Sequence, residues 1–284
     1  MIKKRKNKYG NRILNCIPSR DVEKDWKMEN AVKAGLLAAR AALPSSKDLR
    51  AAWWKIGDQK STGSCVGWAS ADSVIRWHFV KAGWLPNNQL LSPRYVWMAA
   101  KETDQFVSQP TTFIESDGTS LKAALDVARK YGMVRDSVIS FEPINLYPGM
   151  AQTFYALAAQ LKIASYFNLG TNPANWRSWL ANNGPILTRL DVDATWDNAT
   201  YTKGNLDVYQ PNTTRGGHAV ALVGYTPTRF IVRNSWGTAQ WGDQGYGYAG
   251  YGYAALAILA VMVLYAFRTS LAGRPMLSVS HLDD

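Results

Sequence analysis

The feature that most constrains the fold is a change in residue pattern in the second half of the chain. Up to about residue 182 the apolar residues recur at helical spacing, which predicts helices over 64–82, 93–101, 120–131, 151–163 and 173–182. Beyond that point, apolar runs bounded by turn residues predict strands over 186–192, 219–225 and 230–233. Helices followed by strands favour an α+β protein with two segregated halves.

The composition excludes a disordered chain. The chain has 284 residues, of which 47% are hydrophobic and 19% are charged, whereas disorder requires low hydrophobicity and high charge. The length suits one large domain, or two lobes that share a cleft. The longest apolar run, residues 253–267, is shorter than the roughly 20 residues that a membrane-spanning helix needs. We expect a buried strand or core element there, and no membrane span.

The chain contains two cysteines, Cys16 and Cys65, which can form at most one disulfide. A reducing compartment is the simplest interpretation, and no apolar run follows the charged N-terminus as it does in a secretory signal peptide. We therefore expect a cytoplasmic protein, with export by a route without a signal peptide left open. Cys16 is interpreted as an incidental thiol rather than a second nucleophile.

Cys65 has the setting of a reactive thiol. It follows Thr62-Gly63-Ser64 at the predicted start of a helix, where Ser64 is a candidate N-cap. The positive end of a helix dipole and a nearby protonated histidine both lower a thiol pKa. Because the thiolate is the nucleophilic form of cysteine, this position favours nucleophilic chemistry if a histidine lies close by.

One of the three histidines suits that role. His218 follows two glycines and precedes an apolar predicted strand, so its ring can point into a cleft while the strand stays in the core. Asn234 lies across a predicted hairpin from it, and the side-chain oxygen of Asn234 can hold the imidazole without adding a charge. Trp236 can cover that hydrogen bond and exclude water. His78 and His281 are interpreted as structural or solvent-exposed residues.

A further polar group lies shortly before the cysteine. Gln59 carries a side-chain amide, which together with the backbone N–H of Cys65 would supply two hydrogen-bond donors. Two donors aimed at one point form an oxyanion hole, and the loss of one such donor costs about 10²–10³-fold in rate.

Taken in chain order, these motifs resemble the papain family (C1) of cysteine peptidases. The matching stretches are Gln59, Gly63-Ser64-Cys65, Gly217-His218-Ala219-Val220 and Asn234-Ser235-Trp236-Gly237. The intervals from Cys65 to His218 and to Asn234 are slightly longer than the roughly 130–150 residues usual in the family. Weaker similarity at 48–50, 91–93, 117–131 and 234–248 extends the resemblance over about residues 45–267.

The resemblance implies a two-lobe fold, with a helical left lobe, a β-barrel-like right lobe and an active-site cleft between them. It implies that Cys65 is the nucleophile, that His218 is the general base and then the acid, and that Asn234 orients the imidazole. Gln59 would be the oxyanion donor, and Gly118 and Trp236 would contact the substrate. Neither a metal nor an organic cofactor is expected.

Three positions depart from the family pattern. Val66 replaces the tryptophan that usually follows the nucleophile, and Thr62 replaces a cysteine, so the family disulfide at that position is missing. The residues Asp117-Gly118-Thr119 replace paired glycines in the cleft strand, which bears on contacts with the substrate backbone. The missing disulfide and the short N-terminal region favour a bacterial-type member without disulfides.

Residues 1–42 are interpreted as a basic N-terminal arm and residues 43–284 as the peptidase domain, because Leu43-Pro44-Ser45-Ser46 interrupts the helical pattern before it. The first 20 residues hold seven basic side chains and no acidic one, in a chain of net charge +11. Three interpretations stay open: a solvated, disordered tail, a prosegment that covers the cleft, or contact with nucleic acid or membrane. Nucleic acid is disfavoured, because no aromatic residues are interleaved for base stacking.

The sequence therefore predicts a monomeric cysteine endopeptidase that hydrolyses protein or peptide substrates through an acyl-enzyme. Two alternatives stay open. One is a catalytically silent binding protein on the same fold, and the other is a thiol amidase or acyltransferase that acts on a non-peptide substrate.

Overall fold

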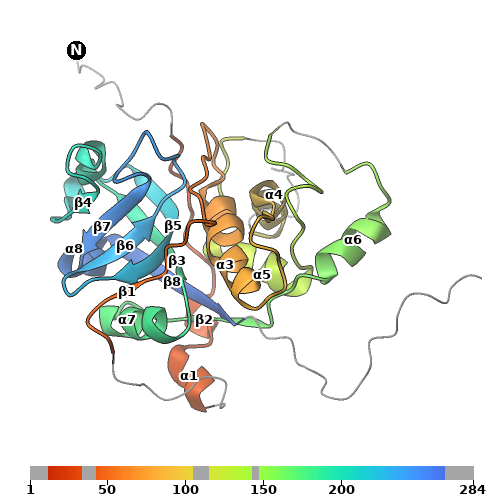
Figure 1. Ribbon diagram of the computed structural model, residues 1–284, viewed down its shortest axis with the longest axis horizontal. Coiled ribbons are helices and arrows are strands. Elements are labelled where there is room, and N and C mark those ends of the chain that lie inside the picture. Colours follow the sequence, from red (N-terminus) through yellow and green to blue (C-terminus); the bar gives the residue numbers. More distant parts are fainter. Residues whose placement is uncertain (1–11, 34–42, 105–114, 143–146, 266–284) are drawn as a thin grey trace, which may run out of the picture.

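The structure is a computed structural model that describes residues 12–33, 43–104, 115–142 and 147–265. A helical half lies beside an eight-stranded sheet, as expected for an α+β protein (Figure 1). His281 and the end of the predicted peptidase domain lie outside the described residues.

The helical half begins with one continuous helix in three parts, α2 (Cys65–Gly67), η2 (Trp68–Ile75) and α3 (Arg76–Lys81). It continues with α4 (Pro93–Asp104), α5 (Leu121–Lys130) and α6 (Ala151–Ala159). Ser120 caps α5 by accepting a hydrogen bond from the N–H of Ala123, and Gly132 follows that helix at a φ of 100°. These helices confirm the helical spacing of the first half of the sequence.

The helix that carries Cys65 differs from the prediction in its capping and in its pitch. Ser64 makes no capping hydrogen bond, and its hydroxyl instead lies 2.6 Å from that of Thr62, so the predicted cap is wrong. Thr62 closes the preceding turn by donating its hydroxyl to the carbonyl of Gln59 at 2.7 Å. The next segment, η2, is a π-helix, a widened turn that is frequent at functional sites.

The strands follow the order β2-β8-β3-β5-β6-β7-β4, and β1 pairs with β5. Their bounds are β1 (Lys47–Asp48), β2 (Ser165–Asn168), β3 (Ile186–Val192), β4 (Asn205–Leu206), β5 (Gly216–Tyr225), β6 (Arg229–Arg233), β7 (Tyr246–Gly250) and β8 (Ile258–Tyr265). All pairs are antiparallel except β4 with β7. The sheet is mixed and is not closed into a barrel, because its edge strands β2 and β4 do not pair with each other, which corrects the barrel-like lobe expected from the sequence.

The long apolar run of the second half forms two elements rather than one. Its first part belongs to the helix α8 (Tyr251–Ala257) and residues 258–265 form β8, which is paired on both sides by β2 and β3. Within the described residues, no helix has both the length and the apolar character needed to cross a bilayer. Most of the described part of the run is therefore buried, as expected, although its first part is helix and Leu256 and Leu259 are exposed.

The sheet is covered by helices that come from distant parts of the sequence. The helix α7 (Pro173–Asn182) packs on β5, and α1 (Met28–Lys33) lies near β2 (Figure 1). Met28 and Ala31 of α1 are buried in the same apolar cluster as Trp176 and Trp179 of α7. Short 3-10 turns at Val22–Lys24, Ala194–Asn198 and Pro211–Thr213 complete the described elements.

A buried ion cluster joins the two halves. Asp72 of η2 accepts hydrogen bonds from Arg76 at 3.1 Å and from Arg233, at the end of β6, at 2.8 Å. All three side chains are at most 5% exposed, so each charge depends on the others for compensation. Asn234 directly follows Arg233, so this ion cluster fixes the position of Asn234 relative to the helix that carries Cys65.

Candidate active site

Cys65 lies where the helical half meets the sheet. It is fully buried at the first residue of α2, and its apolar cluster includes Ala219 of β5. The turn before it is held by the N–H of Gly63, which donates to the carbonyl of Glu115 at 2.8 Å. This turn presents the thiol to β5 from the start of a helix.

His218 and Asn234 meet across the hairpin of β5 and β6. His218 is the third residue of β5, and Asn234 follows the last residue of β6. The register pairs Ala221 with Arg233, and His218 Nε2 lies 2.8 Å from Asn234 Oδ1. Both side chains are buried, so the imidazole is held by an uncharged partner without competition from water.

The contacts of Asn234 also identify the protonated nitrogen of His218. The backbone N–H of Ser235 donates to Asn234 Oδ1 at 2.8 Å, so that atom is an acceptor. Nε2 of His218 must then carry a proton, which leaves Nδ1 as the basic nitrogen of the neutral ring. Nδ1 is buried and has no well-aligned hydrogen-bond partner among the described residues. It is therefore the nitrogen that remains for the sulfur of Cys65.

Two tryptophans contact the imidazole, and a third packs against both of them. The ring centroid of Trp236 lies 4.9 Å from that of His218, and the Trp196 ring meets the imidazole edge-on at 5.7 Å. Trp241 stacks on Trp196 with centroids 4.4 Å apart. Trp236 thus lies against the imidazole that Asn234 holds, and Trp196 packs on another side of the same ring.

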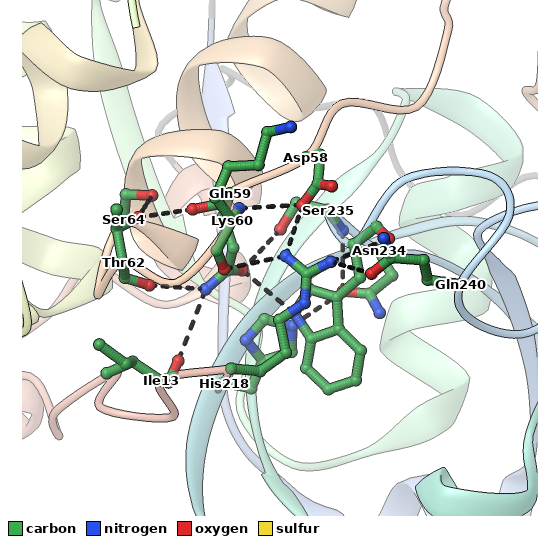
Figure 2. Close-up of polar contacts among 12 residues, drawn as sticks. Ile13, Asp58, Gln59, Lys60, Thr62, Ser64, His218, Asn234, Ser235 and Gln240 are labelled. Carbon is green, nitrogen blue, oxygen red and sulfur yellow. Dashed lines mark hydrogen bonds and ion pairs between the residues drawn. The ribbon is translucent and has the colours of Figure 1, made fainter. Parts of the chain in front are cut away.

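Gln59 links the cysteine turn to the asparagine segment. Its carbonyl oxygen Oε1 accepts hydrogen bonds from the Ser235 hydroxyl at 3.0 Å and from Trp236 Nε1 at 3.2 Å (Figure 2). Because these donors fix Oε1, the amide nitrogen Nε2 points the other way, toward the carbonyls of Thr62 at 3.0 Å and Ile13 at 3.5 Å. The side chain is fully buried, and its four hydrogen bonds fix the direction in which Nε2 donates.

The pKa of the Cys65 thiol is lowered well below its usual value. A hydrogen bond with the side chain of Cys16 is the largest cause, and burial opposes it. His218 lowers the pKa further through a hydrogen bond and through its charge, and the backbone of Ala219 adds a smaller contribution. The surroundings therefore favour a thiolate beside an imidazole, although the site is closed to solvent.

The N-terminal segment 12–20 runs directly past these residues. The carbonyl of Leu14 lies against Gly216, that of Asn15 against Gly118, and that of Cys16 against Gly217. A Cβ atom at Gly118 would lie only 1.9 Å from the Asn15 oxygen, and one at Gly217 only 2.3 Å from the Cys16 oxygen. Glycine is therefore required at both positions for the segment to approach so closely.

Both ends of segment 12–20 are held by side chains. Arg12, whose side chain is 7% exposed, pairs with Asp58 and donates to Gln240 Oε1 at 2.7 Å. At the other end, Lys122 donates its backbone N–H to the Ser19 hydroxyl at 3.3 Å and its ammonium to the Arg20 carbonyl at 3.2 Å. Segment 12–20 is thus attached to the body of the protein at both ends.

The structure brings together all four residues predicted for the chemistry. Gly118 lies against Asn15 of segment 12–20, and Trp236 lies over His218, so their contacts with a substrate stay predictions. Sequence reasoning missed Trp196, Trp241 and the proximity of Cys16. Gly216 and Gly217, the two glycines before His218, mark the place where a second chain segment approaches.

The chain is similar to one family of known proteins over most of its length. The pattern of the papain family cysteine proteases matches residues 43–266. A search of the curated proteins finds no significant match.

Several solved structures share the fold. Xylellain, a cysteine protease from Xylella fastidiosa, is 21% identical, with a TM-score of 0.71, and the match covers 94% of this chain and 100% of that one. The digestive procathepsin L2 proteinase from Tenebrio molitor larval midgut is 19% identical, with a TM-score of 0.65 and coverage of 92% and 81%. The procathepsin B S9 from Trypanosoma congolense is 15% identical, with a TM-score of 0.64 and coverage of 91% and 88%.

Proposed function

Because this chain belongs to the papain family of cysteine proteases, and is thus a cysteine-type peptidase, we propose that it is an endopeptidase that acts through Cys65, His218, Asn234 and Gln59. The observation that carries the proposal is the imidazole of His218, which Asn234 holds at 2.8 Å while its other nitrogen is left to Cys65. That arrangement provides a nucleophile, a base and a group that orients the base.

In the acylation step, the Cys65 thiolate attacks the carbonyl carbon of a peptide bond. The negative charge that develops on the carbonyl oxygen is stabilised by Gln59 Nε2 and the backbone N–H of Cys65. His218, protonated at both nitrogens, transfers the Nδ1 proton to the leaving amine as the C–N bond breaks. The products are the free amine and a thioester on Cys65.

In the deacylation step, His218 is neutral and Nδ1 accepts a proton from an attacking water molecule. The resulting hydroxide adds to the thioester carbonyl, and the C–S bond then breaks to release the carboxylic acid. Asn234 keeps the proton on Nε2 throughout, because its Oδ1 only accepts hydrogen bonds from Nε2 and the Ser235 N–H. The tryptophans around the ring limit competition from bulk water for that bond.

We further propose that segment 12–20 blocks substrate binding. Its backbone lies against Gly118 and Gly217, and the Ile13 carbonyl faces Gln59 Nε2 at 3.5 Å, the donor assigned to the oxyanion. The carbonyl at this donor belongs to Ile13, whereas the residue beside the Cys65 sulfur is Cys16. Nucleophilic attack requires a single peptide group whose carbonyl oxygen lies at Gln59 Nε2 and whose carbonyl carbon lies at the Cys65 sulfur. Because two different residues of the segment lie at these two positions, the segment fills the site without being cleaved.

The test compares the full chain with a variant that lacks residues 1–20, each with and without Cys65→Ala. We expect the shortened protein to hydrolyse members of a peptide library and to bind one equivalent of an epoxide inhibitor on Cys65. The full chain should react more slowly with both, and Cys65→Ala should abolish both reactions.

Two results would contradict the proposal. A folded, shortened protein that cleaves no peptide and takes no label would favour a silent binding protein. A labelled protein that hydrolyses only non-peptide amides, or that transfers the acyl group to an amine, would favour the amidase or acyltransferase alternative.

A further inference from the structure

The two cysteines of the chain, far apart in sequence, are brought into contact at the active site. Cys16 and Cys65 are 2% and 0% exposed and belong to the same apolar cluster, and the Cys16 side chain is the largest cause of the lowered pKa of Cys65. Both are free thiols in the structure. The remaining 282 positions hold no cysteine, since the chain has only 2 among its 284 residues, so each thiol has the other as its single intramolecular partner.

The position of Cys16 is fixed by its backbone. Its N–H donates to the carbonyl of Gly217 at 2.9 Å, and its carbonyl accepts from Arg189 Nε at 2.9 Å. The next residue, Ile17, donates its N–H to the carbonyl of Thr119 at 3.2 Å. These bonds attach the segment to β5 on one side and to the start of α5 on the other, so the Cys16 side chain is held toward Cys65.

We propose that Cys16 and Cys65 form an oxidation-sensitive thiol pair, which hydrogen peroxide converts into an intramolecular disulfide that locks segment 12–20 onto the site. The regulatory consequence rests on the proposed function of Cys65 as the nucleophile, but the covalent site itself does not. A bond between the two sulfurs is about 2.05 Å long. Cys16, which its backbone attaches to Gly217 next to His218, lies in the same buried cluster as Cys65, so the two side chains are placed to form it.

The oxidation proceeds in two balanced steps. The Cys65 thiolate displaces hydroxide from hydrogen peroxide and becomes a sulfenic acid, so the sulfur loses two electrons and the peroxide gains them. The Cys16 thiol then attacks the sulfenic sulfur, the S–S bond forms, and the hydroxyl group leaves as water with the Cys16 proton. Overall, two thiols and one peroxide give one disulfide and two waters.

The site selects the order of these steps. The same contacts that favour the thiolate form of Cys65 make it the first sulfur to react, because oxidation follows thiolate character. Burial of both sulfurs excludes bulky disulfide oxidants, whereas peroxide is small and uncharged. A small dithiol or a thioredoxin-like reductant reverses the reaction by thiol–disulfide exchange, once the segment opens enough to expose a sulfur.

Cys16 also protects the nucleophile from permanent damage. A sulfenic acid that meets no thiol is oxidised further to sulfinic and sulfonic acids, which dithiols do not reduce. With Cys16 adjacent, the sulfenic acid is trapped as a reducible disulfide. An oxidised molecule is therefore both inactive and recoverable.

The experiment uses the full chain, its Cys16→Ser variant and its Cys65→Ser variant. Each reduced protein is treated with hydrogen peroxide, free thiols are blocked with an alkylating reagent under denaturing conditions, and the protein is digested without reduction. We expect the wild-type monomer to lose two hydrogen atoms and to yield one peptide that joins Cys16 to Cys65, which a dithiol reverts. In Cys16→Ser, we expect Cys65 to become a sulfinic or sulfonic acid that a dithiol does not restore.

Three outcomes would overturn the proposal: wild-type Cys65 that gains oxygen while Cys16 stays alkylatable, a disulfide that joins two molecules, or two thiols that survive peroxide in the folded protein. The same proteins also distinguish a failure of this proposal from a failure of the proposed function. If the joined peptide forms and the reduced, shortened protein still cleaves no substrate, the thiol pair stands and the peptidase assignment of Cys65 fails.

Discussion

The helical half and the sheet contribute to the active site in different ways. On the helical side, Gln59 and Cys65 belong to one short segment, which local hydrogen bonds of Thr62 hold in shape. On the sheet side, His218 and Asn234 come from two strands, and the rings that enclose the imidazole come from a 3-10 turn and a loop. The first arrangement depends on a local turn, whereas the second depends on strand register and tertiary packing.

This difference identifies the part of the site whose geometry is sensitive to structural changes far from the catalytic residues. A shift of one residue in the pairing of β5 with β6 would separate His218 from Asn234 and turn the imidazole to the other face of the sheet. The cysteine turn has no such dependence on register. The buried cluster of Asp72, Arg76 and Arg233 is the direct ionic connection between the two arrangements.

The largest effect is expected on the sheet side, from His218→Ala. Without the imidazole, no group takes the proton from water or gives one to the leaving amine, so kcat/KM should fall by about 10⁴-fold or more. The loss also removes a contact that lowers the pKa of Cys65, so alkylation of the thiol should require higher pH. Steady-state kinetics and alkylation rates on proteins without residues 1–20 measure both effects.

His78→Gln is the matched control, since it removes the half-buried imidazole of α3, which lies outside the site. Retention of more than about a tenth of the activity by His218→Ala would show that the sheet side does not supply the base.

The next effect concerns the link between the halves. Asp72→Ala leaves the guanidinium groups of Arg76 and Arg233 buried without their carboxylate, which should cost about 3–5 kcal/mol in the free energy of unfolding. Urea unfolding measures this loss. Asp21→Ala removes an exposed pair with Lys24 and should leave the urea midpoint unchanged. Equal midpoints for the two variants would mean that the ion cluster does not hold the halves together.

The smallest effect is a pH dependence of stability from His78. Burial lowers the pKa of His78 from its usual value of 6.5 to about 4, so the folded protein keeps the ring neutral while the unfolded chain binds a proton. The free energy of unfolding should therefore be unaffected by this residue above pH 6.5 and should fall as pH decreases from 6.5 toward 4.

Urea unfolding of the wild type and of His78→Gln at several pH values isolates this contribution, because glutamine can donate to the carbonyl of Pro185 as His78 does but does not titrate. Parallel pH curves for the two proteins would contradict it. The contrast with His218 is then direct. Among the described residues, no side chain favours the charged form of the half-buried His78 ring, whereas His218 lies beside a thiol whose negative charge it stabilises.

Local patterns were enough to predict much of the fold. The helix α4 and the strands β3, β5 and β6 match their predicted ranges to within a few residues, because helical spacing and turn residues are visible in a short window. The split of residues 253–265 into α8 and β8 could not be predicted, since an unbroken apolar run has no periodicity to distinguish helix from strand. The extent of sheet closure likewise depends on which edge strands meet, and no local pattern records that.

The same limit applies to the site. Gln59, Cys65, His218 and Asn234 were predicted because their residue types, order and flanking motifs carry chemical meaning. Trp196 and Trp241 are ordinary core residues by type, and only packing places them around the imidazole. The proximity of Cys16 was missed for a related reason. The segment that carries it contacts the site through its backbone carbonyls, which lie against glycines elsewhere in the chain, so its own side chains do not indicate the contact.

The division of the site between the two halves also has a consequence during synthesis. A ribosome makes Cys65 and Gln59 early and His218 and Asn234 only near the end, so a growing chain carries its sulfur long before the imidazole exists. Until β5 and β6 pair, that sulfur lacks the base that activates it. We expect the nascent polypeptide to cleave neither itself nor neighbouring proteins, and Cys65 to become a reactive nucleophile only when β5 and β6 have paired.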